Sequence, residues 1–215
     1  MQITNIGIIG SGDVGQTLAN GFLQSGHNVK LGTREPDKLQ QWLMGSGANA
    51  SIGTFEEAAK FGEIIVLCVK GTAVREAIRL AKKKHFSNKV VIDVTNPLVF
   101  LKEKEPPVLE HGFPKSNGII VQKMLPNSKV VKAFNTVTAK YMVNPRLQEG
   151  TPDLFICGDN EGKEKVRTIA GAWGWNVIDM GPIEQSYLLE ALAMVWIRYG
   201  FLHNHWTHAF KLLRN

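Results

Sequence analysis

The segment from Asn5 to Leu23 constrains the fold of this chain more than any other. It begins with a short apolar run, Ile6 to Ile9, which predicts a strand buried on both faces. The run stops at Gly10-Ser11-Gly12-Asp13-Val14-Gly15, which matches the pattern G-x-G-x-x-G, and a helix is predicted from Gln16 to Leu23. A strand, this glycine pattern and a helix in direct succession are typical of a dinucleotide-binding unit.

Each glycine has a separate physical task in such a unit. Gly10 lets the chain turn sharply after the strand, and Gly15 lets the helix pack closely against it. Gly12 lets the backbone approach a pyrophosphate, because no Cβ atom lies in the way. The N–H groups at the start of the helix would face the anion, with the positive end of the helix dipole behind them.

The end of the second predicted strand, His27 to Leu31, indicates which dinucleotide binds. In NAD-preferring folds an acidic residue here bonds the ribose hydroxyls, but this chain continues with Thr33 and Arg34, and with Lys38 one turn further on. A 2′-phosphate would be repelled by a carboxylate and held by an arginine. We therefore expect these three residues to select NADP(H). The alternative is an ordinary surface arginine after a strand.

Strands and helices alternate over most of the remaining chain, which predicts an α/β fold with a doubly wound (Rossmann), mostly parallel sheet and C-terminal helices. One stretch is irregular: Leu101 to Ile119 contains three prolines and mixed charges, and we expect a long connection over the cleft. The further strands are predicted at Ala48 to Ile52, Ile64 to Val69, Lys89 to Val94, Lys129 to Phe134, Leu154 to Cys157 and Asn176 to Met180.

The last part of the chain differs in character. We expect residues 1–182 to form an NADP-binding Rossmann domain and residues 183–215 a helical segment. Apolar residues cover most of the helix circumference up to Trp196, so this segment must be buried by another surface. Gly200 is expected to divide it into two helices. We expect the segment to close the cleft and to pair two subunits into a homodimer.

The charge and cysteine content of the chain argue against some classes of function. The net charge is +6, but the basic residues are scattered and the densest run is Lys82-Lys83-Lys84, so we predict no nucleic-acid partner. A positive field still suits a polyanionic cofactor. The two cysteines, Cys68 and Cys157, lie in apolar runs and are interpreted as small buried hydrophobic residues.

No membrane partner is expected either. Glu190 and Arg198 interrupt the most apolar region, which leaves it short of the roughly 20 apolar residues of a membrane span. The chain enters its first strand almost at once, which leaves no room for a signal peptide. These two patterns predict a cytoplasmic protein.

The residues that follow the central strands are Thr95, Asn96, Asn135 and Thr136. They are neutral hydrogen-bonding groups, suited to a carboxamide or a pteridine-like edge, and we predict no catalytic acid or base. Hydride transfer between two bound cofactors requires only alignment and exclusion of water, whereas an alcohol dehydrogenase requires a general base.

The chain also has histidines near its end, His203, His205 and His208, on what is expected to be the last helix. Only the last two of these share a helix face, and a metal site would require a third ligand from elsewhere. We predict no metal, and expect these rings to line a ligand site or to pack.

Several motifs in a fixed order resemble one family. They are Gly10 to Gly15, Leu31-Gly32-Thr33-Arg34, Asp93-Val94-Thr95-Asn96-Pro97, Leu125-Pro126, Val130-Val131-Lys132-Ala133-Phe134-Asn135, Cys157-Gly158-Asp159 and Asp179-Met180-Gly181. The set resembles the NADP oxidoreductases typified by deazaflavin (coenzyme F420)-dependent NADP reductase. It is equally similar to the cytosolic domain of the six-transmembrane metalloreductases, which passes hydride from NADPH to a flavin.

This resemblance covers the chain from Ile6 to about Pro182 and implies roles for individual residues. Asn96 and Asn135 would lie near the nicotinamide and its acceptor. The connection from Leu101 to Ile119 and the final helices match neither relative closely. The cofactor-binding set implied by sequence and resemblance together is Gly10, Ser11, Gly12, Asp13 and Val14 for the pyrophosphate, Thr33, Arg34 and Lys38 for the 2′-phosphate, Val69 and Val74 for the cleft wall, and Thr95, Asn96 and Asn135.

The predicted function is an NADP(H)-dependent oxidoreductase that transfers hydride between NADPH and a flavin-like acceptor, either coenzyme F420 or FAD/FMN as a second ligand. The partner is thus a small-molecule redox cofactor that serves as substrate. Two alternatives stay open: a small imine or ketone reductase of the pyrroline-carboxylate type, and a non-catalytic NADP(H) sensor.

Overall fold

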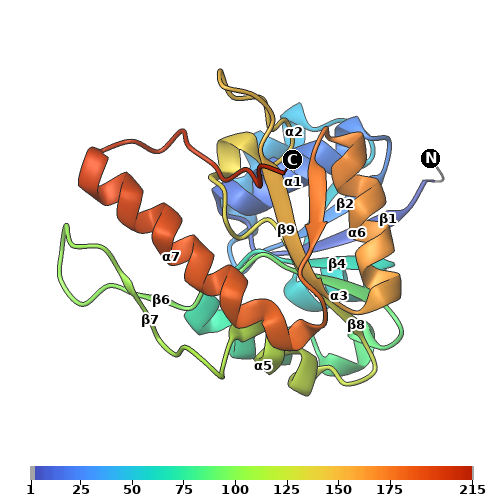
Figure 1. Cartoon of the computed structure of the whole chain (residues 1–215). Coiled ribbons are helices and arrows are strands. Elements are labelled where there is room, and N and C mark those ends of the chain that lie inside the picture. The colour runs from blue at the N-terminus through green and yellow to red at the C-terminus, as the bar shows by residue number, and fades with distance from the viewer. Residues whose placement is uncertain (1–2, 215) are drawn as a thin grey trace.

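The computed structural model describes residues 3–214 and is built around one eight-stranded sheet (Figure 1). The strand order is β10-β9-β8-β5-β4-β1-β2-β3. All neighbouring strands are parallel except β8 and β9, so the predicted doubly wound, mostly parallel sheet is confirmed. The strands are β1 (Asn5–Ile9), β2 (Asn28–Gly32), β3 (Ala50–Gly53), β4 (Ile64–Leu67), β5 (Val90–Asp93), β8 (Lys129–Lys132), β9 (Asp153–Gly158) and β10 (Asn176–Asp179).

The strand order reverses between β1 and β4. The chain moves from β1 outward to β2 and β3, then returns to β4 on the other side of β1 and continues to β5 and β8. In open sheets of this kind, ligands bind beyond the carboxyl ends of the strands at such a switch point. The fold therefore places a crevice where the glycine-rich turn follows β1.

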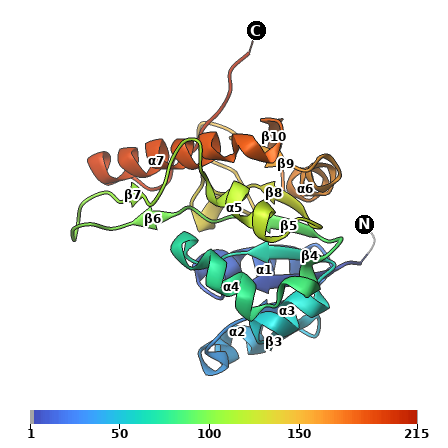
Figure 2. The same cartoon turned by 90° about the horizontal axis from the view of Figure 1, so that it is seen from below.

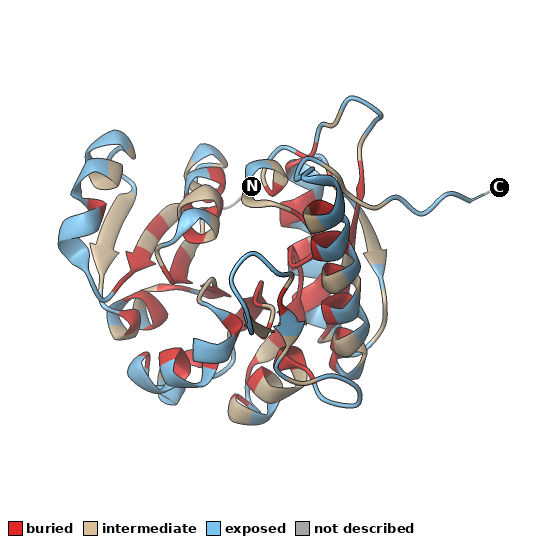
Figure 3. Cartoon of the chain, turned by 90° about the vertical axis from the view of Figure 1, so that its left-hand side faces the viewer, coloured by how far each residue is buried: buried red, intermediate tan, exposed pale blue. Residues whose placement is uncertain are grey.

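Helices cover both faces of the sheet, as Figure 2 shows from below. The alternation of side chains along β4 explains why both faces are apolar: Ile64 and Val66 pack on the side of α1 and α6, while Ile65 and Leu67 pack on the side of α3, α4 and α5. Figure 3 shows the central strands buried between these layers. The helices are α1 (Asp13–Gln24), α2 (Gln40–Gly45), α3 (Phe55–Phe61), α4 (Val74–Leu80), α5 (Asn117–Met124), α6 (Asn160–Ala172) and α7 (Ser186–His203).

The connection expected to be irregular contains a small hairpin instead. Strands β6 (Leu98–Val99) and β7 (Val108–Leu109) pair antiparallel and lie beside α7 in Figures 1 and 2. Phe113, just beyond the hairpin, contacts the ring of Tyr187 on α7, with centroids 5.0 Å apart. The sequence did not predict this pairing, because a strand of two residues leaves almost no alternating pattern of apolar and polar residues.

The C-terminal segment holds one helix where two were expected. Helix α7 continues through Gly200, where the indole of Trp206 packs so closely that a Cβ atom would approach it to 2.5 Å. After His203 the chain leaves the helix and returns along β9, where Asp153 N donates to Phe210 O. His205 and His208 therefore lie beyond the helix rather than on it.

Two further expectations concern burial. Cys157 is buried and Cys68 is half-buried; both thiols are free, and burial raises the pKa of Cys157 to about 12. Both thus act as inert packing groups. Among the helices of residues 3–214, none is long and apolar enough to cross a bilayer.

Candidate functional site

The glycine-rich turn after β1 has the predicted geometry. Gly10 has φ +114°, and a Cβ atom there would lie 2.6 Å from the carbonyl oxygen of Cys68. A Cβ atom at Gly15 would lie 2.0 Å from the carbonyl oxygen of Gly10. Gly12, in contrast, has nothing within 4 Å of its Cβ position. Two glycines are therefore required by packing, and the third faces open space.

The start of α1 has free main-chain donors. Gly12 occupies the N-cap position and supplies no side-chain acceptor, so the first N–H groups of the helix lack a capping partner. The loop is held in place from behind, since Gln16 Nε2 donates to Ser11 O at 2.8 Å. Asp13 and Val14 stand at this helix start, where they present main-chain N–H groups. This arrangement fits an anion such as a pyrophosphate.

The end of β2 lies against the same turn. The Thr33 hydroxyl is buried and accepts hydrogen bonds from Ser11 Oγ and from Glu35 N, each at 3.0 Å. Arg34 is exposed, and within residues 3–214 no hydrogen bond or ion pair engages its guanidinium. The corner thus combines a fixed hydroxyl with an arginine free to meet a phosphate.

Lys38 is less available than its position in the sequence indicated. Its ammonium group pairs with Glu35 on the exposed η1 turn (Pro36–Leu39), and that hydrogen bond lowers the pKa of Glu35. An exposed pair of this kind contributes little to stability, because water screens it. Lys38 can therefore leave Glu35 for another anion at little cost, but its ammonium group is not already held beside Arg34.

The two valines assigned to the cleft wall differ in depth. Val69 is half-buried just after β4, whereas Val74 is 1% exposed at the first turn of α4 and belongs to the core. Val74 also borders a cavity of about 220 Å³ beside Gly71, His111 and Asn117.

Asn96 and Asn135 form a reciprocal pair at the carboxyl ends of β5 and β8. Asn96 Nδ2 donates to the carbonyl oxygen of Asn135 at 2.8 Å, and Asn135 Nδ2 donates to Asn96 Oδ1 and to Leu189 O, both at 2.9 Å. Asn135 Oδ1 is buried and has no hydrogen-bond partner. A buried amide oxygen without a donor is costly, so this atom fits a ligand that carries N–H groups, such as a carboxamide.

Thr95 is used inside the protein. Its hydroxyl donates to Asp93 Oδ1 at 2.7 Å and accepts from Asn117 Nδ2 at 2.9 Å, and the residue is 3% exposed. The Thr95 hydroxyl is therefore used within the protein and offers no free group to a ligand.

Below the amide pair lies a buried charge cluster that the sequence analysis missed. Lys132 at the end of β8 contacts Asp93 Oδ2 at 3.0 Å and Glu190 Oε1 at 2.8 Å, and it also donates to the carbonyl oxygen of Thr95. All three ionisable side chains are at most 1% exposed. The signal in the sequence is a charged residue inside each of three apolar segments, which rarely occurs without a partner.

The cluster joins four elements of the fold. Besides Lys132, Glu190 Oε1 accepts from the N–H groups of Asn117 and Gly118 at the start of α5, while Glu190 Oε2 has no partner. Burial raises the pKa of Glu190 despite the adjacent lysine. Burial opposes the charge on Lys132 as well, but the carboxylates of Asp93 and Glu190 outweigh it and raise its pKa. Strands β5 and β8 are thus fastened to α5 and α7 directly beneath the amide pair.

Residues 3–214 contain no group of three or more His, Cys, Asp or Glu side chains arranged to hold a metal ion. The converging groups at this edge of the sheet are main-chain donors, hydroxyls, amides and one free arginine. Such a set can bind a phosphorylated ligand and orient an amide.

Comparison with known proteins agrees with this geometry. The family model described as "NADP oxidoreductase coenzyme F420-dependent" matches residues 5–97. The chain is 29% identical over 211 residues to F420-dependent NADP reductase of Methanocaldococcus jannaschii, covering 92% of the chain and 91% of the relative. It is 34% identical over 194 residues to metalloreductase STEAP3 of Rattus norvegicus, covering 90% of the chain but only 37% of that protein. The chain thus spans little more than a third of the metalloreductases that it matches.

A solved structure extends the likeness over the whole chain. The crystal structure of a candidate F420-dependent NADP reductase from Arthrobacter sp. FB24 superposes with a TM-score of 0.92 at 31% identity. The match covers 99% of this chain and 100% of the other. The C-terminal segment, which carries no part of the family-model match, is therefore shared with at least one relative.

Proposed function

The chain belongs to the family of coenzyme F420-dependent NADP oxidoreductases, and from this premise we propose that it transfers a hydride between NADPH and a flavin-like acceptor, either coenzyme F420 or a flavin. The observation that carries the proposal is the corner where the uncapped start of α1 meets Thr33 and the free Arg34. It offers separate groups for a pyrophosphate and for an additional phosphate on the ribose.

In this proposal NADP(H) lies across the carboxyl ends of the strands. The main-chain N–H groups from Gly12 to Val14 bind the pyrophosphate. Thr33 and Arg34 bind the 2′-phosphate, with Lys38 as a mobile third group. The unpaired Oδ1 of Asn135 accepts from the carboxamide and so fixes which face of the nicotinamide is presented. Val69 borders the cleft between these points.

The bound nicotinamide supplies the hydride, and the chain has to orient it and keep water away. The amide pair of Asn96 and Asn135 is held by its reciprocal hydrogen bonds and by the carbonyl oxygen of Leu189, which accepts from Asn135 Nδ2. Helix α7 contacts this amide pair through Leu189, and in this proposal it limits the access of water. Alignment of two bound cofactors in this way requires no acid or base from the protein.

The donor side is tested by equilibrium titration with NADPH and NADH. We expect tighter binding of NADPH, and we expect Arg34→Ala to weaken NADPH binding roughly ten- to a hundredfold, since a hydrogen bond to a charged group contributes about 1.5–3 kcal/mol. NADH binding should change little. Arg79→Ala is the matched control, because Arg79 is an exposed arginine paired with Glu76 on α4. Equal affinities for both nucleotides in the unaltered protein would refute the phosphate role.

The acceptor side is tested by anaerobic mixing with NADPH and a panel of flavins, coenzyme F420, cyclic imines and ketones. Oxidation of NADPH by the flavin or deazaflavin arm supports the proposal. Turnover of an imine or ketone alone would replace it by a reductase of small substrates. Binding of NADPH without any turnover, accompanied by a change in assembly state, would favour a sensor.

We further propose that residues 183–215 act as a separate unit that closes the cleft of the domain formed by residues 1–182 and pairs two subunits. Helix α7 exposes Leu188, Val195 and Leu202, which are 38%, 58% and 64% exposed and recur every seventh residue along one side. Such a stripe suits the same helix of a second copy across a two-fold axis. Light scattering should give a dimer that Val195→Glu dissociates and Lys165→Glu on α6 does not. A monomeric unaltered protein at micromolar concentration would exclude this pairing.

A further inference from the structure

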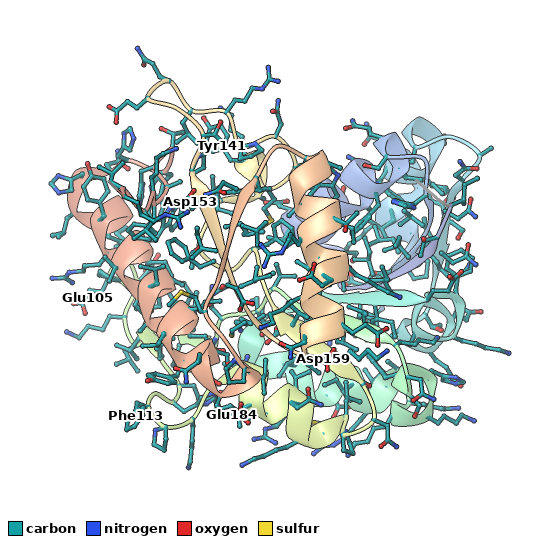
Figure 4. All side chains as sticks on the ribbon, turned by 45° about the vertical axis from the view of Figure 1, so that its right-hand side comes forward. Glu105, Phe113, Tyr141, Asp153, Asp159 and Glu184 are labelled. Atoms are coloured by element: carbon teal, nitrogen blue, oxygen red, sulfur yellow. The ribbon has the colours of Figure 1, made fainter. Side chains whose placement is uncertain are left out.

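A cavity bordered by the C-terminal segment is separate from the proposed nucleotide crevice. It has a volume of about 500 Å³ and lies between the loop that precedes β9 and the chain that follows α7. This volume is within the range of small-molecule sites. Figure 4 shows Tyr141 and Asp153 at this end of the molecule, beside the end of α7. Nothing in the proposed hydride transfer uses this cavity.

The walls of the cavity are held by specific contacts. On one side, Lys211 Nζ donates to Thr151 O at 2.8 Å, and Leu212 N donates to Asp153 Oδ2 at 2.7 Å. On the other, Trp196 Nε1 donates to the carbonyl oxygen of His208 at 2.7 Å, and the two rings are stacked 4.5 Å apart. The segment after α7 is therefore fixed across the mouth of the cavity on both sides.

Positive charge predominates around the cavity. Arg146 and Lys211 line it, and Lys140 lies over the ring of Tyr141 at 5.4 Å, next to the same wall. Glu149 is the carboxylate in the lining. Asp153 lies nearby, but its two oxygens already accept from Leu212 N and Asn176 Nδ2. A phosphate or carboxylate would therefore meet an excess of cationic groups.

The same walls offer groups that match hydroxyls. Tyr141, Tyr199 and Thr207 each bring a hydroxyl to the lining. His208 Nε2 faces the carbonyl oxygen of Trp196 at 2.9 Å and so must carry the hydrogen, because a carbonyl oxygen can only accept. The other ring nitrogen, Nδ1, is buried and has no partner, so it is an acceptor that lacks a donor. A hydroxylated chain would satisfy it.

The position of the cavity relates it to the amide pair. Leu189, whose carbonyl oxygen accepts from Asn135, and Tyr199, which lines the cavity, are both on α7. Tyr199 follows Leu189 by ten positions, and at 1.5 Å per residue this interval spans about 15 Å along the helix. This separation is comparable to the reach of a flat three-ring heterocycle that carries a short polyol chain.

We propose that this cavity binds the polyol and anionic tail of the acceptor whose ring stacks beside the nicotinamide. The inference rests on the proposed hydride transfer and specifies its substrate class: an acceptor with a hydroxylated chain that ends in a phosphate or carboxylate. Arg146 and Lys211 bind the anion, and His208 Nδ1 accepts from a hydroxyl of the chain. Acceptors without the charged end are then poorer substrates.

The test compares FMN with riboflavin, which differ only by the terminal phosphate, with NADPH as donor. In the unaltered protein we expect a KM for FMN about tenfold below that for riboflavin, the size of one charged hydrogen bond. In the double variant Arg146→Gln/Lys211→Met this ratio should fall toward one. Both residues are exposed, so the variant should fold. Lys165→Ala, which removes an exposed cation from α6, should keep the ratio of the unaltered protein.

A deazaflavin pair, coenzyme F420 and its chromophore without the phosphorylated tail, gives the second arm. If both members of each pair are turned over with equal KM values, the cavity does not bind the tail of the acceptor, and the proposed hydride transfer is retained. Loss of NADPH affinity in the double variant, as large as its loss of FMN affinity, would place the two cations at the nucleotide and would also overturn it.

Equilibrium binding, followed by quenching of flavin fluorescence, does not depend on turnover. Tighter binding of FMN than of riboflavin, lost in the double variant, supports the cavity even when no hydride is transferred. Failure of both flavins and both deazaflavins to bind would overturn it.

Discussion

The two ends of the crevice are built by different means. The proposed nucleotide end, from Gly10 to Arg34, consists of main-chain groups and a free guanidinium, contributed by residues close together in the sequence. The other end depends on Asp93, Lys132 and Glu190, which come from three distant segments and meet in full burial. The first region tolerates solvent and is poised to bind an anion. The second region is buried, and its charged side chains pair with one another.

This difference indicates where mutations should change the free energy of unfolding most. A main-chain site loses affinity when a side chain fills it, but the fold is kept. A buried ion cluster is different, because removing one partner leaves an uncompensated charge in a medium that solvates it poorly. We therefore expect stability effects to be concentrated at the cluster and binding effects at the turn.

The largest effect should come from Lys132→Met. This change leaves two buried carboxyl groups without their cation and should lower the free energy of unfolding by about 3–5 kcal/mol. Urea denaturation followed by circular dichroism measures it, with Lys165→Met on the exposed face of α6 as control. The double variant Lys132→Met/Glu190→Met should be less destabilised than the single one. A loss below about 1 kcal/mol for Lys132→Met would contradict the role of the cluster, since exposed pairs contribute that little.

A smaller effect separates two glycines of the same turn. Gly15→Ala places a Cβ atom 2.0 Å from the carbonyl oxygen of Gly10, so we expect it to destabilise the protein by about 1–3 kcal/mol. Gly12→Ala meets nothing within 4 Å and should keep the stability of the unaltered protein while weakening NADPH binding. Thermal unfolding and NADPH titration of both variants make the comparison. If Gly12→Ala bound NADPH with undiminished affinity, the open space at that position would not be the pyrophosphate site.

The smallest effect is a difference in pH dependence. Because burial raises the pKa of Glu190 in the folded state above its ordinary value of 4.5, the folded protein binds more protons there than the unfolded chain. The stabilising contribution is complete below pH 4.5 and is lost as the pH rises through the folded-state pKa. Glu190→Gln should therefore flatten the decline in unfolding free energy as the pH rises above 4.5. Parallel curves for both proteins in urea titrations at several pH values would show that Glu190 does not titrate in this range.

The same contrast separates what the sequence predicted from what it concealed. The glycine geometry and the Thr33–Arg34 corner depend on residues within about one βαβ unit, where local patterns are informative. The charge cluster depends on contacts across up to 58 residues, between Lys132 and Glu190, and no local period encodes it. Thr95 illustrates the limit: its position after β5 was correctly predicted, but its hydroxyl is consumed by Asp93 and Asn117.

The C-terminal segment was misjudged for a related reason. Gly200 indicated a break in the helix, because glycine disfavours helix interiors by about 1 kcal/mol. The structure uses its missing side chain instead to admit the ring of Trp206, a contact that depends on the chain folding back after Asn204. His205 and His208 then line a cavity rather than a helix face.

An unbroken α7 has one more consequence. Its main-chain hydrogen bonds fix the interval between Glu190 at one end and Tyr199 toward the other, so neither can approach the other unless the helix melts. Helix α7 therefore holds a spacer of constant length between the proposed hydride-transfer end and the C-terminal cavity. An acceptor whose chain is one or two bonds too short would have to give up either its ring position or its anchor.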